Sequence, residues 1–234
     1  MLDATLIRAR LLCSSVRELT FKASPELSFQ PGQWVSLHFP GYRNDQGELL
    51  KGAYSIASAP SNDGRFDLCV ARVKDGQASA LLHAASIGER FPITGPFGAF
   101  LMAAIDRPFL MVATGTGIAP FRSMLQASVT QARRPMALLF GNRDESESLY
   151  RSEFEALEHN SPHFAFYPTL SQPSSGWTGR VGYVQSHVLD IAARLGAPAC
   201  DAYICGQPAM VKDVCRILHV QLGLEAKRIH VERY

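Results

Sequence analysis

The chain has 234 residues, of which 47% are hydrophobic and 19% are charged. This composition is typical of a globular protein and excludes a disordered one, and the length suits one large domain or two ordinary domains. The formal net charge of +2 is too small to indicate a nucleic-acid-binding protein.

No apolar run approaches the ~18–20 residues that a membrane-spanning helix needs. The first residues, Met1–Ala4, lack the charged and then apolar order of a secretory signal. The cysteines are odd in number, and their spacing matches neither a zinc ribbon, a thioredoxin-like pair nor a plant-type iron–sulfur site. Their positions are Cys13, Cys69, Cys200, Cys205 and Cys215. We therefore expect a cytoplasmic protein with reduced thiols, no metal site and no membrane span.

The first hundred residues consist of short β-rich segments separated by turn residues such as Pro31 and Gly32. The predicted strands are Thr5–Leu12, Glu18–Ala23, Trp34–Phe39, Ala53–Ala57, Phe66–Val73 and Glu89–Ile93. One helix, rich in Ala and Leu, is predicted over Ala78–Ala85. Many short strands at regular spacing favour an antiparallel barrel or sandwich.

From about Ala104 onward, apolar strands alternate with amphipathic helices. The predicted strands are Phe109–Ala113, Met136–Phe140, His163–Leu170, Ala202–Cys205 and Ile229–Val231. The predicted helices begin at Ile118, at Asp144 (where Glu147 resembles a capping box), at Val184 (ending at Leu195), and before a face of Val211, Val214, Leu218 and Leu222. This alternation predicts right-handed βαβ units and a parallel sheet covered on both sides. We expect two domains, 1–103 and 104–234.

A glycine-rich turn, Thr114-Gly115-Thr116-Gly117, follows the buried strand Phe109–Ala113. Such a turn brings backbone N–H groups close to a phosphate at the positive end of the next helix, and Pro120 suits the first turn of that helix. The third glycine of a dinucleotide fingerprint is absent, and the alternative is a tight strand–helix connection.

A second glycine–hydroxyl element, Gly76-Gln77-Ala78-Ser79, begins the helix of the first half. A helix N-terminus with a hydroxyl can bind a phosphate, although an ordinary N-cap is the alternative. Two such helix starts in two unlike domains fit two nucleotide cofactors, or a cofactor and a substrate nucleotide, that meet at a domain cleft.

Seven short strings occur in an order that resembles the ferredoxin–NADP⁺ reductase superfamily of flavin enzymes, and the resemblance covers nearly the whole chain. The strings are Pro31–Val35, Ala53–Ser58, Gly76–Ser79, Gly95–Gly98, Gly115–Pro120, Cys205–Met210 and Glu232–Tyr234. The resemblance implies an N-terminal antiparallel Greek-key β-barrel that binds FAD and a C-terminal doubly wound parallel α/β domain that binds NAD(P).

On the flavin side, the resemblance implies that Tyr54 stacks on the isoalloxazine and that the Ser55 hydroxyl lies near flavin N5. The flavin contacts that it implies are Lys51, Ala53, Tyr54, Ser55, Val70, Arg72, Gly76, Gln77, Ala78 and Ser79. The chain departs from the family at Gly52, where an Arg is usual, and Lys51 is the adjacent source of positive charge. This departure leaves FMN as an alternative to FAD. The alternative for Tyr54 and Ser55 is a cross-strand Tyr and a turn Ser.

On the nicotinamide side, the resemblance implies contacts at Thr114, Gly115, Thr116, Gly117, Pro120, Arg143, Cys205 and Gly206. Cys205 would lie beside the nicotinamide ring, Tyr234 would stack on the other flavin face, and Glu232 would line the site and relay protons. Together with Ser55 these are the expected catalytic residues. The alternatives are a small buried Cys, a frayed terminus and a solvated carboxylate.

The second strand of this half ends in Gly141-Asn142-Arg143-Asp144, where a doubly wound fold reads the adenosine ribose. Arg143 favours the 2′-phosphate of NADPH, with Tyr150, Arg151 and Arg180 as helpers. The alternative is a solvated Arg143 beside a helix cap, with NADH as the donor. Trp177 lies in a loop and is expected to pack on a domain surface rather than to touch the nucleotide.

These expectations give one leading hypothesis and three alternatives. The leading one is an FAD-dependent NAD(P)H reductase that passes electrons to a one-electron protein acceptor such as ferredoxin or flavodoxin. The enzyme alternatives are an NADH-using reductase component of an oxygenase and a reductase of free flavin or quinone. The non-enzyme alternative is a nucleotide-sensing or assembly subunit.

Overall fold

The computed structural model describes residues 1–102, 106–197 and 199–233. Contacts divide the chain into two units. The barrel unit contains Met1–Leu101 and Ala119–Ala127, and the sheet unit contains Met102–Ile118 and Ser128–Tyr234. The predicted boundary between residues 103 and 104 lies outside the described residues and stays a prediction.

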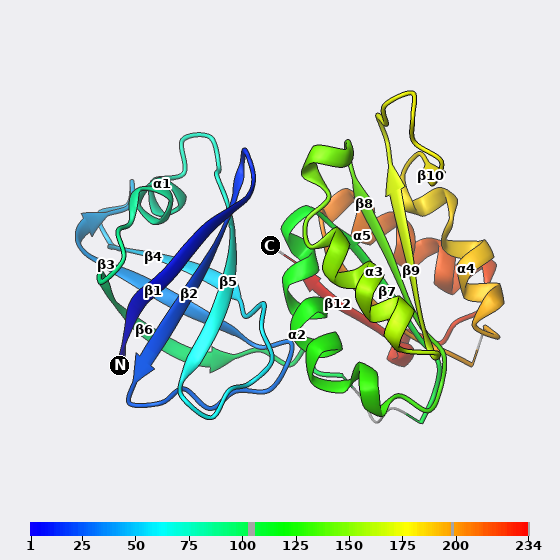
Figure 1. The fold of residues 1–234 in the computed structure, drawn as a ribbon, viewed down its shortest axis with the longest axis horizontal. Helices are drawn as coiled ribbons and strands as arrows, with labels where there is room; N and C mark the ends of the chain where they lie inside the picture. Colours follow the sequence, from blue (N-terminus) through cyan, green and yellow to red (C-terminus); the bar gives the residue numbers. More distant parts are fainter. Residues whose placement is uncertain (103–105, 198, 234) are drawn as a thin grey trace. The chain divides into compact units, whose positions relative to one another are not determined.

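The barrel unit is built on a six-stranded antiparallel sheet in the order β4-β3-β6-β1-β2-β5 (Figure 1). The strands are β1 (Leu2–Cys13), β2 (Val16–Ser24), β3 (Trp34–Arg43), β4 (Leu49–Ser55), β5 (Arg65–Ala71) and β6 (Arg90–Phe97). An antiparallel bridge between Ile56 and Leu68 links the end of β4 to β5, the two edge strands of the sheet. The predicted antiparallel barrel is therefore confirmed.

Side chains that point to one face of these strands form the barrel core. The Phe21 ring stacks on Phe66 at 5.6 Å and meets Phe91 edge-on at 5.8 Å. Helix α1 (Gln77–Ala84) adds the buried Leu82 to the same core. Each such large side chain contributes about 1.5–3 kcal/mol when it is withdrawn from water, so this core stabilises the barrel.

Helix α2 (Ala119–Ser128) packs on the barrel through buried charges. The Arg122 guanidinium donates to Asp67 at 3.0 Å and to the Ala57 carbonyl at 2.9 Å, and it lies 3.5 Å from Glu18. The Glu18 side chain is fully buried and also accepts from Arg8 and Arg10. Burial of these charges is tolerated because each one has partners of opposite sign.

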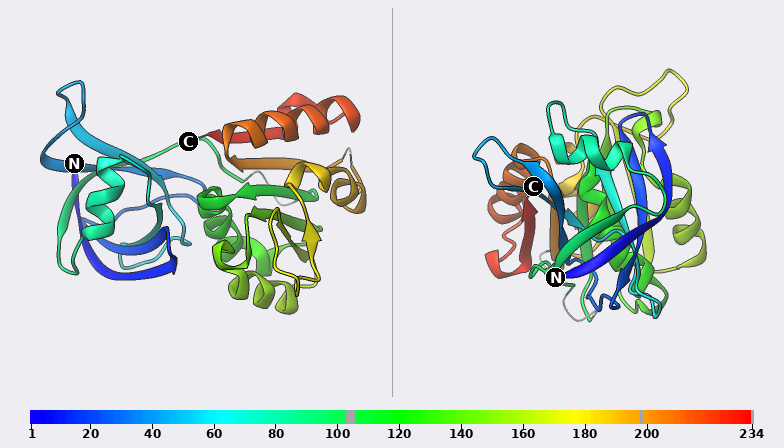
Figure 2. Two further views of the ribbon diagram at one scale, coloured as in Figure 1. Left: turned by 90° about the horizontal axis from the view of Figure 1, so that it is seen from above. Right: turned by 90° about the vertical axis from the view of Figure 1, so that its left-hand side faces the viewer.

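The sheet unit contains a six-stranded sheet in the order β10-β9-β8-β7-β11-β12, and every neighbouring pair is parallel. The strands are β7 (Phe109–Thr114), β8 (Met136–Asn142), β9 (Phe164–Leu170), β10 (Arg180–Val181), β11 (Asp201–Gly206) and β12 (Ile229–Arg233). Helices α4 (Val188–Arg194) and α5 (Pro208–Arg216) cover one face and α3 (Arg151–Asn160) covers the other (Figure 2). The predicted parallel α/β fold is confirmed.

Two helix predictions were wrong in detail. Asp144 does not begin a long helix: its carboxylate accepts from the Ser146 N–H at 2.9 Å and caps a single 3₁₀ turn, Glu145–Glu147. Tyr150 then adopts a left-handed conformation, with φ +56°, which interrupts the helical backbone before α3 begins. The helix predicted over Val184–Leu195 is a 3₁₀ turn followed by α4, because the two segments are separated at His187.

No helix among the described residues is long and apolar enough to cross a membrane.

Candidate functional site

The glycine-rich turn joins β7 to α2 as a 3₁₀ turn, Gly115–Ile118, and it packs tightly against the end of β11. A Cβ on Gly117 would lie 2.4 Å from the Cys205 carbonyl oxygen, and a Cβ on Gly206 would lie 2.3 Å from Thr114 Oγ1. The Thr114 hydroxyl also accepts from the Gln207 N–H at 3.2 Å. Glycine at these positions lets the carboxyl ends of β7 and β11 approach each other, and Pro120 lies in the first turn of α2 as predicted.

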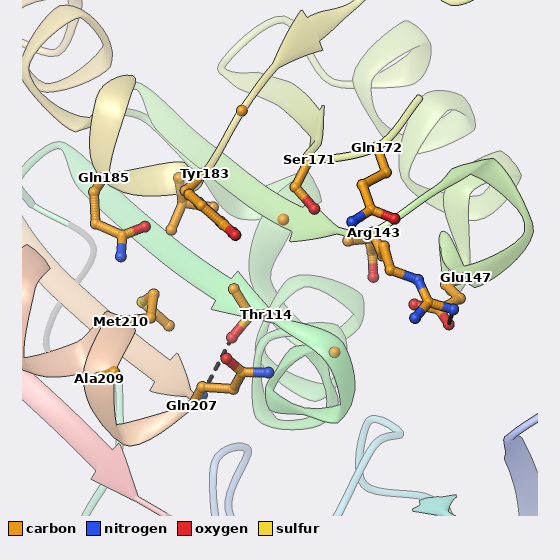
Figure 3. A pocket seen from close by; sticks show the side chains of 15 residues that line it. Thr114, Arg143, Glu147, Ser171, Gln172, Tyr183, Gln185, Gln207, Ala209 and Met210 are labelled. Atoms are coloured by element: carbon orange, nitrogen blue, oxygen red, sulfur yellow. Dashed lines mark hydrogen bonds and ion pairs between the residues drawn. The ribbon is translucent and has the colours of Figure 1, made fainter. Parts of the chain in front are cut away.

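A pocket of about 580 Å³ opens at the carboxyl ends of the parallel strands (Figure 3). We call it the strand-end pocket. Its lining residues are Thr114, Gly115, Gly141, Asn142, Arg143, Glu147, Ser171, Gln172, Gly182, Tyr183, Val184, Gln185, Gln207, Ala209 and Met210. Open α/β sheets bind their ligands in this position, and the volume suits a nucleotide.

Two amide side chains of the strand-end pocket have buried polar atoms without a hydrogen-bond partner among the described residues. These atoms are Asn142 Nδ2 and Gln185 Oε1, and the Gln185 side chain points into the pocket (Figure 3). A buried amide without a partner is costly, so these groups fit a polar ligand that supplies the missing bonds. Sequence reasoning missed both residues. Asn142 lies in the predicted strand tip Gly141–Asp144, where only Arg143 was given a ligand, whereas nothing in the sequence marked Gln185.

At the far end of the pocket Arg143 is shared between carboxylates. Its guanidinium lies 3.2 Å from Glu147 and 3.7 Å from Asp144, and its side chain remains 60% exposed. A hydrogen bond from Ser146 holds the pKa of Asp144 below its usual range, so this carboxylate stays charged. Arg143 and Glu147 both line the pocket, which therefore combines a cation that suits a phosphate with an acid that suits a ribose hydroxyl.

Tyr150, one predicted helper of Arg143, does not line the strand-end pocket, and the two predicted arginine helpers are engaged elsewhere. Arg151 lies over the Trp177 ring at 4.9 Å and bonds Glu155 at 2.6 Å. Arg180 lies over the Tyr167 ring at 5.2 Å and bonds Asp190 at 2.9 Å. Neither arginine lines the strand-end pocket, so Arg143 is the arginine that the described residues place there.

Cys205 and Glu232 are neighbours on adjacent strands at one end of the sheet. Cys205 is fully buried, and partial burial raises the pKa of the Glu232 carboxyl. His230, two residues earlier on the same face of β12, stacks on Tyr203 at 4.4 Å, and burial lowers its pKa. Sequence reasoning did not single out His230. The predicted role of Tyr234 lies outside the described residues.

In the barrel unit, Tyr54 lies over Gly52 on one face of β4. A Cβ on Gly52 would lie 2.7 Å from the Tyr54 ring, and burial raises the pKa of the Tyr54 phenol to about 12. The residues between and beside them alternate to the other face of the strand. These residues are Lys51, Ala53 and the buried Ser55. The Lys51 side chain therefore lies on the opposite face of β4 from a side chain at position 52, and its charge does not replace that of an arginine there.

The start of helix α1 leaves its first N–H groups, those of Gln77 and Ala78, without partners inside the helix. The Ser79 hydroxyl is buried, accepts from the Val73 N–H at 3.1 Å and donates to the Gly76 carbonyl at 2.9 Å. It therefore fastens the loop that leads into the helix.

Two neighbours complete this part of the barrel unit. The exposed Arg72 donates to the Ala80 carbonyl at 3.3 Å and brings a positive charge to α1. Val70 lies in the core, and its carbonyl bonds His83, so it supports the site from within. N–H groups without partners inside the helix, an adjacent arginine and a partly buried tyrosine fit the pyrophosphate and ring of a flavin nucleotide.

Two family models match the chain. One is described as an oxidoreductase FAD-binding domain and matches residues 3–102, and the other is described as an oxidoreductase NAD-binding domain and matches residues 111–216. The ferredoxin–NADP reductase B of Sorangium cellulosum (strain So ce56) is 42% identical, over 99% of this chain and 97% of its own length. The toluate 1,2-dioxygenase electron transfer component of Pseudomonas putida is 30% identical, over 99% of this chain and 67% of its own length.

Solved structures share the fold. A ferredoxin NADP⁺ reductase from Neisseria gonorrhoeae with bound FAD and NADP superposes with a TM-score of 0.82. The superposition covers 99% of this chain and 97% of that chain, at 23% identity. At this identity the similarity demonstrates a common fold.

Proposed function

Because the chain belongs to the ferredoxin–NADP⁺ reductase superfamily of flavin-dependent oxidoreductases, we propose that it transfers hydride from NAD(P)H to FAD and delivers the electrons to a protein acceptor such as ferredoxin or flavodoxin. One observation carries the proposal: an FAD-binding and an NAD-binding family model match one after the other along the chain, and the second match contains every residue that lines the strand-end pocket. The cofactor's own chemistry is to accept two electrons together and to release them singly.

The chain's residues have separate tasks in this proposal. In the sheet unit, the glycine-rich turn binds the nicotinamide nucleotide's pyrophosphate, while Asn142 and Gln185 bond its polar groups. In the barrel unit, the start of α1 and Arg72 hold the FAD pyrophosphate, and Tyr54 packs on the flavin ring. Position and electrostatics are what such a protein supplies to its cofactors.

Four residues are proposed for the chemistry itself, as the family resemblance implied. Ser55 orients the flavin at N5, and Cys205 shapes the approach of the nicotinamide. Glu232, whose pKa is raised by burial, holds a proton more readily than an exposed carboxyl does. Tyr234 covers the second flavin face.

We propose NADPH as the preferred donor. The pair of Arg143 with Glu147 is exposed, and an exposed pair contributes only about 0–1 kcal/mol, so a doubly charged 2′-phosphate can displace the carboxylate. The relative that is similar over almost its whole length is an NADP reductase by name. We also propose a cytoplasmic location, where such a donor is available.

Anaerobic stopped-flow absorbance tests the proposal directly. The purified protein should be yellow, release FAD rather than FMN on denaturation, and bleach when NADPH is added. Addition of oxidised ferredoxin should then restore the absorbance. If the protein binds flavin but neither NADPH nor NADH bleaches the flavin absorbance, the result would instead favour a nucleotide-sensing subunit.

One alternative has its own support. Glu147 lines the strand-end pocket, and an acid at this position favours the ribose of NADH. The similarity to a dioxygenase electron transfer component then suggests a reductase component of an oxygenase. Faster bleaching by NADH than by NADPH would favour this alternative. Rapid turnover with free flavin or quinone, without any protein acceptor, would favour a free flavin or quinone reductase.

A further inference from the structure

The 171–179 loop between β9 and β10 is fastened to the segment that follows β8. Its backbone pairing continues beyond the strand ends: the Ser171 N–H donates to the Asn142 carbonyl at 3.1 Å, and the Gln172 N–H donates to the Arg143 carbonyl at 2.7 Å. The other end of the loop returns to β9, where the Gly182 N–H donates to the Leu170 carbonyl at 2.8 Å. Both ends of the loop therefore lie at the strand-end pocket.

Beyond Gln172 the backbone pairing stops, and a side chain continues the attachment. The Glu145 carboxylate accepts from the Ser174 hydroxyl at 2.6 Å and from the Ser174 N–H at 3.1 Å. The hydrogen bond from Ser174 holds the pKa of Glu145 below its usual range, so the acceptor stays charged at neutral pH. Hydrogen bonds to a charged acceptor are stronger than neutral ones.

Trp177 makes the second attachment. The Arg151 guanidinium lies over its ring at 4.9 Å, and its indole N–H donates to the Arg180 carbonyl at 2.8 Å. The ring folds back on its own loop, where a Cβ on Gly179 would lie 2.3 Å from it. Cation–π contact and the indole bond together hold the middle of the loop against the start of α3.

We propose that Glu145 and Trp177 are positioning residues for the adenosine-ribose end of the bound nicotinamide nucleotide. Neither residue lines the strand-end pocket, but Arg143, Glu147, Ser171 and Gln172 do. The two attachments keep the segments that carry these four residues together. Releasing either attachment frees one wall of the pocket, and binding then has to order that wall again. The inference rests on the proposed function, because it takes the pocket's ligand to be NAD(P).

The test measures binding of NADP⁺ and NAD⁺ by calorimetry to the flavin-loaded full-length protein and to its Glu145→Ala and Trp177→Leu variants. We expect the Kd for NADP⁺ to rise about fivefold in each variant, which corresponds to the loss of one such contact. In steady-state assays the KM for NADPH should rise with it, while kcat and the FAD content stay within about twofold. Hydrogen exchange of residues 171–180 should quicken.

Asp63→Ala is the matched control, because the Asp63 carboxylate also accepts from a serine hydroxyl, that of Ser61 at 2.9 Å, but belongs to the barrel unit. It should leave the Kd unchanged, and Glu145→Gln should restore part of the affinity lost in Glu145→Ala. An unchanged Kd in both loop variants, or an equal rise in Asp63→Ala, would overturn the positioning role alone. A wild-type protein that binds neither NADP⁺ nor NAD⁺ would overturn the proposed function and this inference together.

Discussion

The proposed preference for NADPH depends on the Arg143 side chain. It reaches Glu147 and Asp144 but remains 60% exposed, so a ligand phosphate competes with carboxylates that are themselves solvated. We expect Arg143→Ala to raise the KM for NADPH about tenfold and to change the KM for NADH by less than twofold, because only NADPH carries the 2′-phosphate.

Steady-state kinetics with both donors at fixed ionic strength checks this expectation. Arg194→Ala is the control, since Arg194 bonds Asp190 at 3.1 Å and does not line the pocket. Equal effects of Arg143→Ala on both donors would mean that this arginine does not distinguish them.

Glu232 gives the stability of the protein a dependence on pH. Burial raises the pKa of this carboxyl in the folded protein, so its stabilising contribution is complete below about pH 4.5 and is lost as pH rises through the folded-state pKa. Glu232→Gln should therefore match the wild type in melting temperature near pH 4 and exceed it at pH 7.

Thermal unfolding of both proteins across this pH range provides the measurement. A Glu232→Gln variant that is less stable than the wild type at pH 7 would show that the ionised carboxylate is stabilised by a partner in the folded protein.

Helix α2 depends on one buried cation. Arg122→Met would leave Asp67 with Thr20, which donates to it at 2.6 Å, and would remove the charge between Asp67 and Glu18. Breaking a buried ion pair costs about 3–5 kcal/mol, and we expect a loss near the lower end because both acids keep other partners.

Urea denaturation measures the loss. Arg8→Met is a matched control, because Arg8 bonds the same Glu18 from a side chain that is 58% exposed, and it should cost at most about 1 kcal/mol. Equal losses in the two variants would show that α2 is held mainly by apolar packing.

The periodicity of apolar residues predicted most strands and helices. The failed predictions occur where a side chain bonds a nearby backbone group and so competes with helix formation. The strands of both units follow an apolar pattern that tertiary packing reinforces. The predicted helix at Asp144 failed because the Asp144 carboxylate bonds Ser146 and because Tyr150 adopts a left-handed conformation. Neither feature has a periodic signature, so the sequence pattern alone did not distinguish a single capped turn from a helix.

Among the described residues each unit contains a hydrophobic cluster of its own, which allows a test of cofactor binding. The barrel core and the sheet core are distinct clusters in the described residues. A cofactor that binds only the folded barrel unit stabilises it by about 2.7 kcal/mol at a hundredfold excess over Kd. Removing FAD should therefore lower the melting temperature of the barrel unit, whereas NADP⁺ should act on the sheet unit.

Calorimetry of the FAD-free protein, with and without each nucleotide, would resolve these effects. If FAD and NADP⁺ raise the melting temperature of one shared transition equally, the two units unfold together. The expected assignment of one ligand to each unit would then be contradicted by this measurement.

At this scale the sequence predicted the fold classes and the glycine-rich turn of the nucleotide site. It did not predict Gln185 or the loop attachment at Glu145, because these depend on segments that only the folded sheet brings together. Gly52 illustrates the same limit. The departure from the family arginine was evident in the sequence, but the Tyr54 ring that now lies over that position was not.

Gly115 and Gly117, which follow β7, favour glycine for two different physical reasons. Gly115 has φ +54° and no atom within 4 Å of a Cβ built on it, so Asn, which tolerates that conformation, should be accepted there. Gly117 would place any Cβ 2.4 Å from backbone oxygen, which no rotamer change relieves. Substitution is therefore limited by backbone conformation at Gly115 and by contact with the β11 backbone at Gly117, and an engineer who varies this turn should begin with Asn at Gly115.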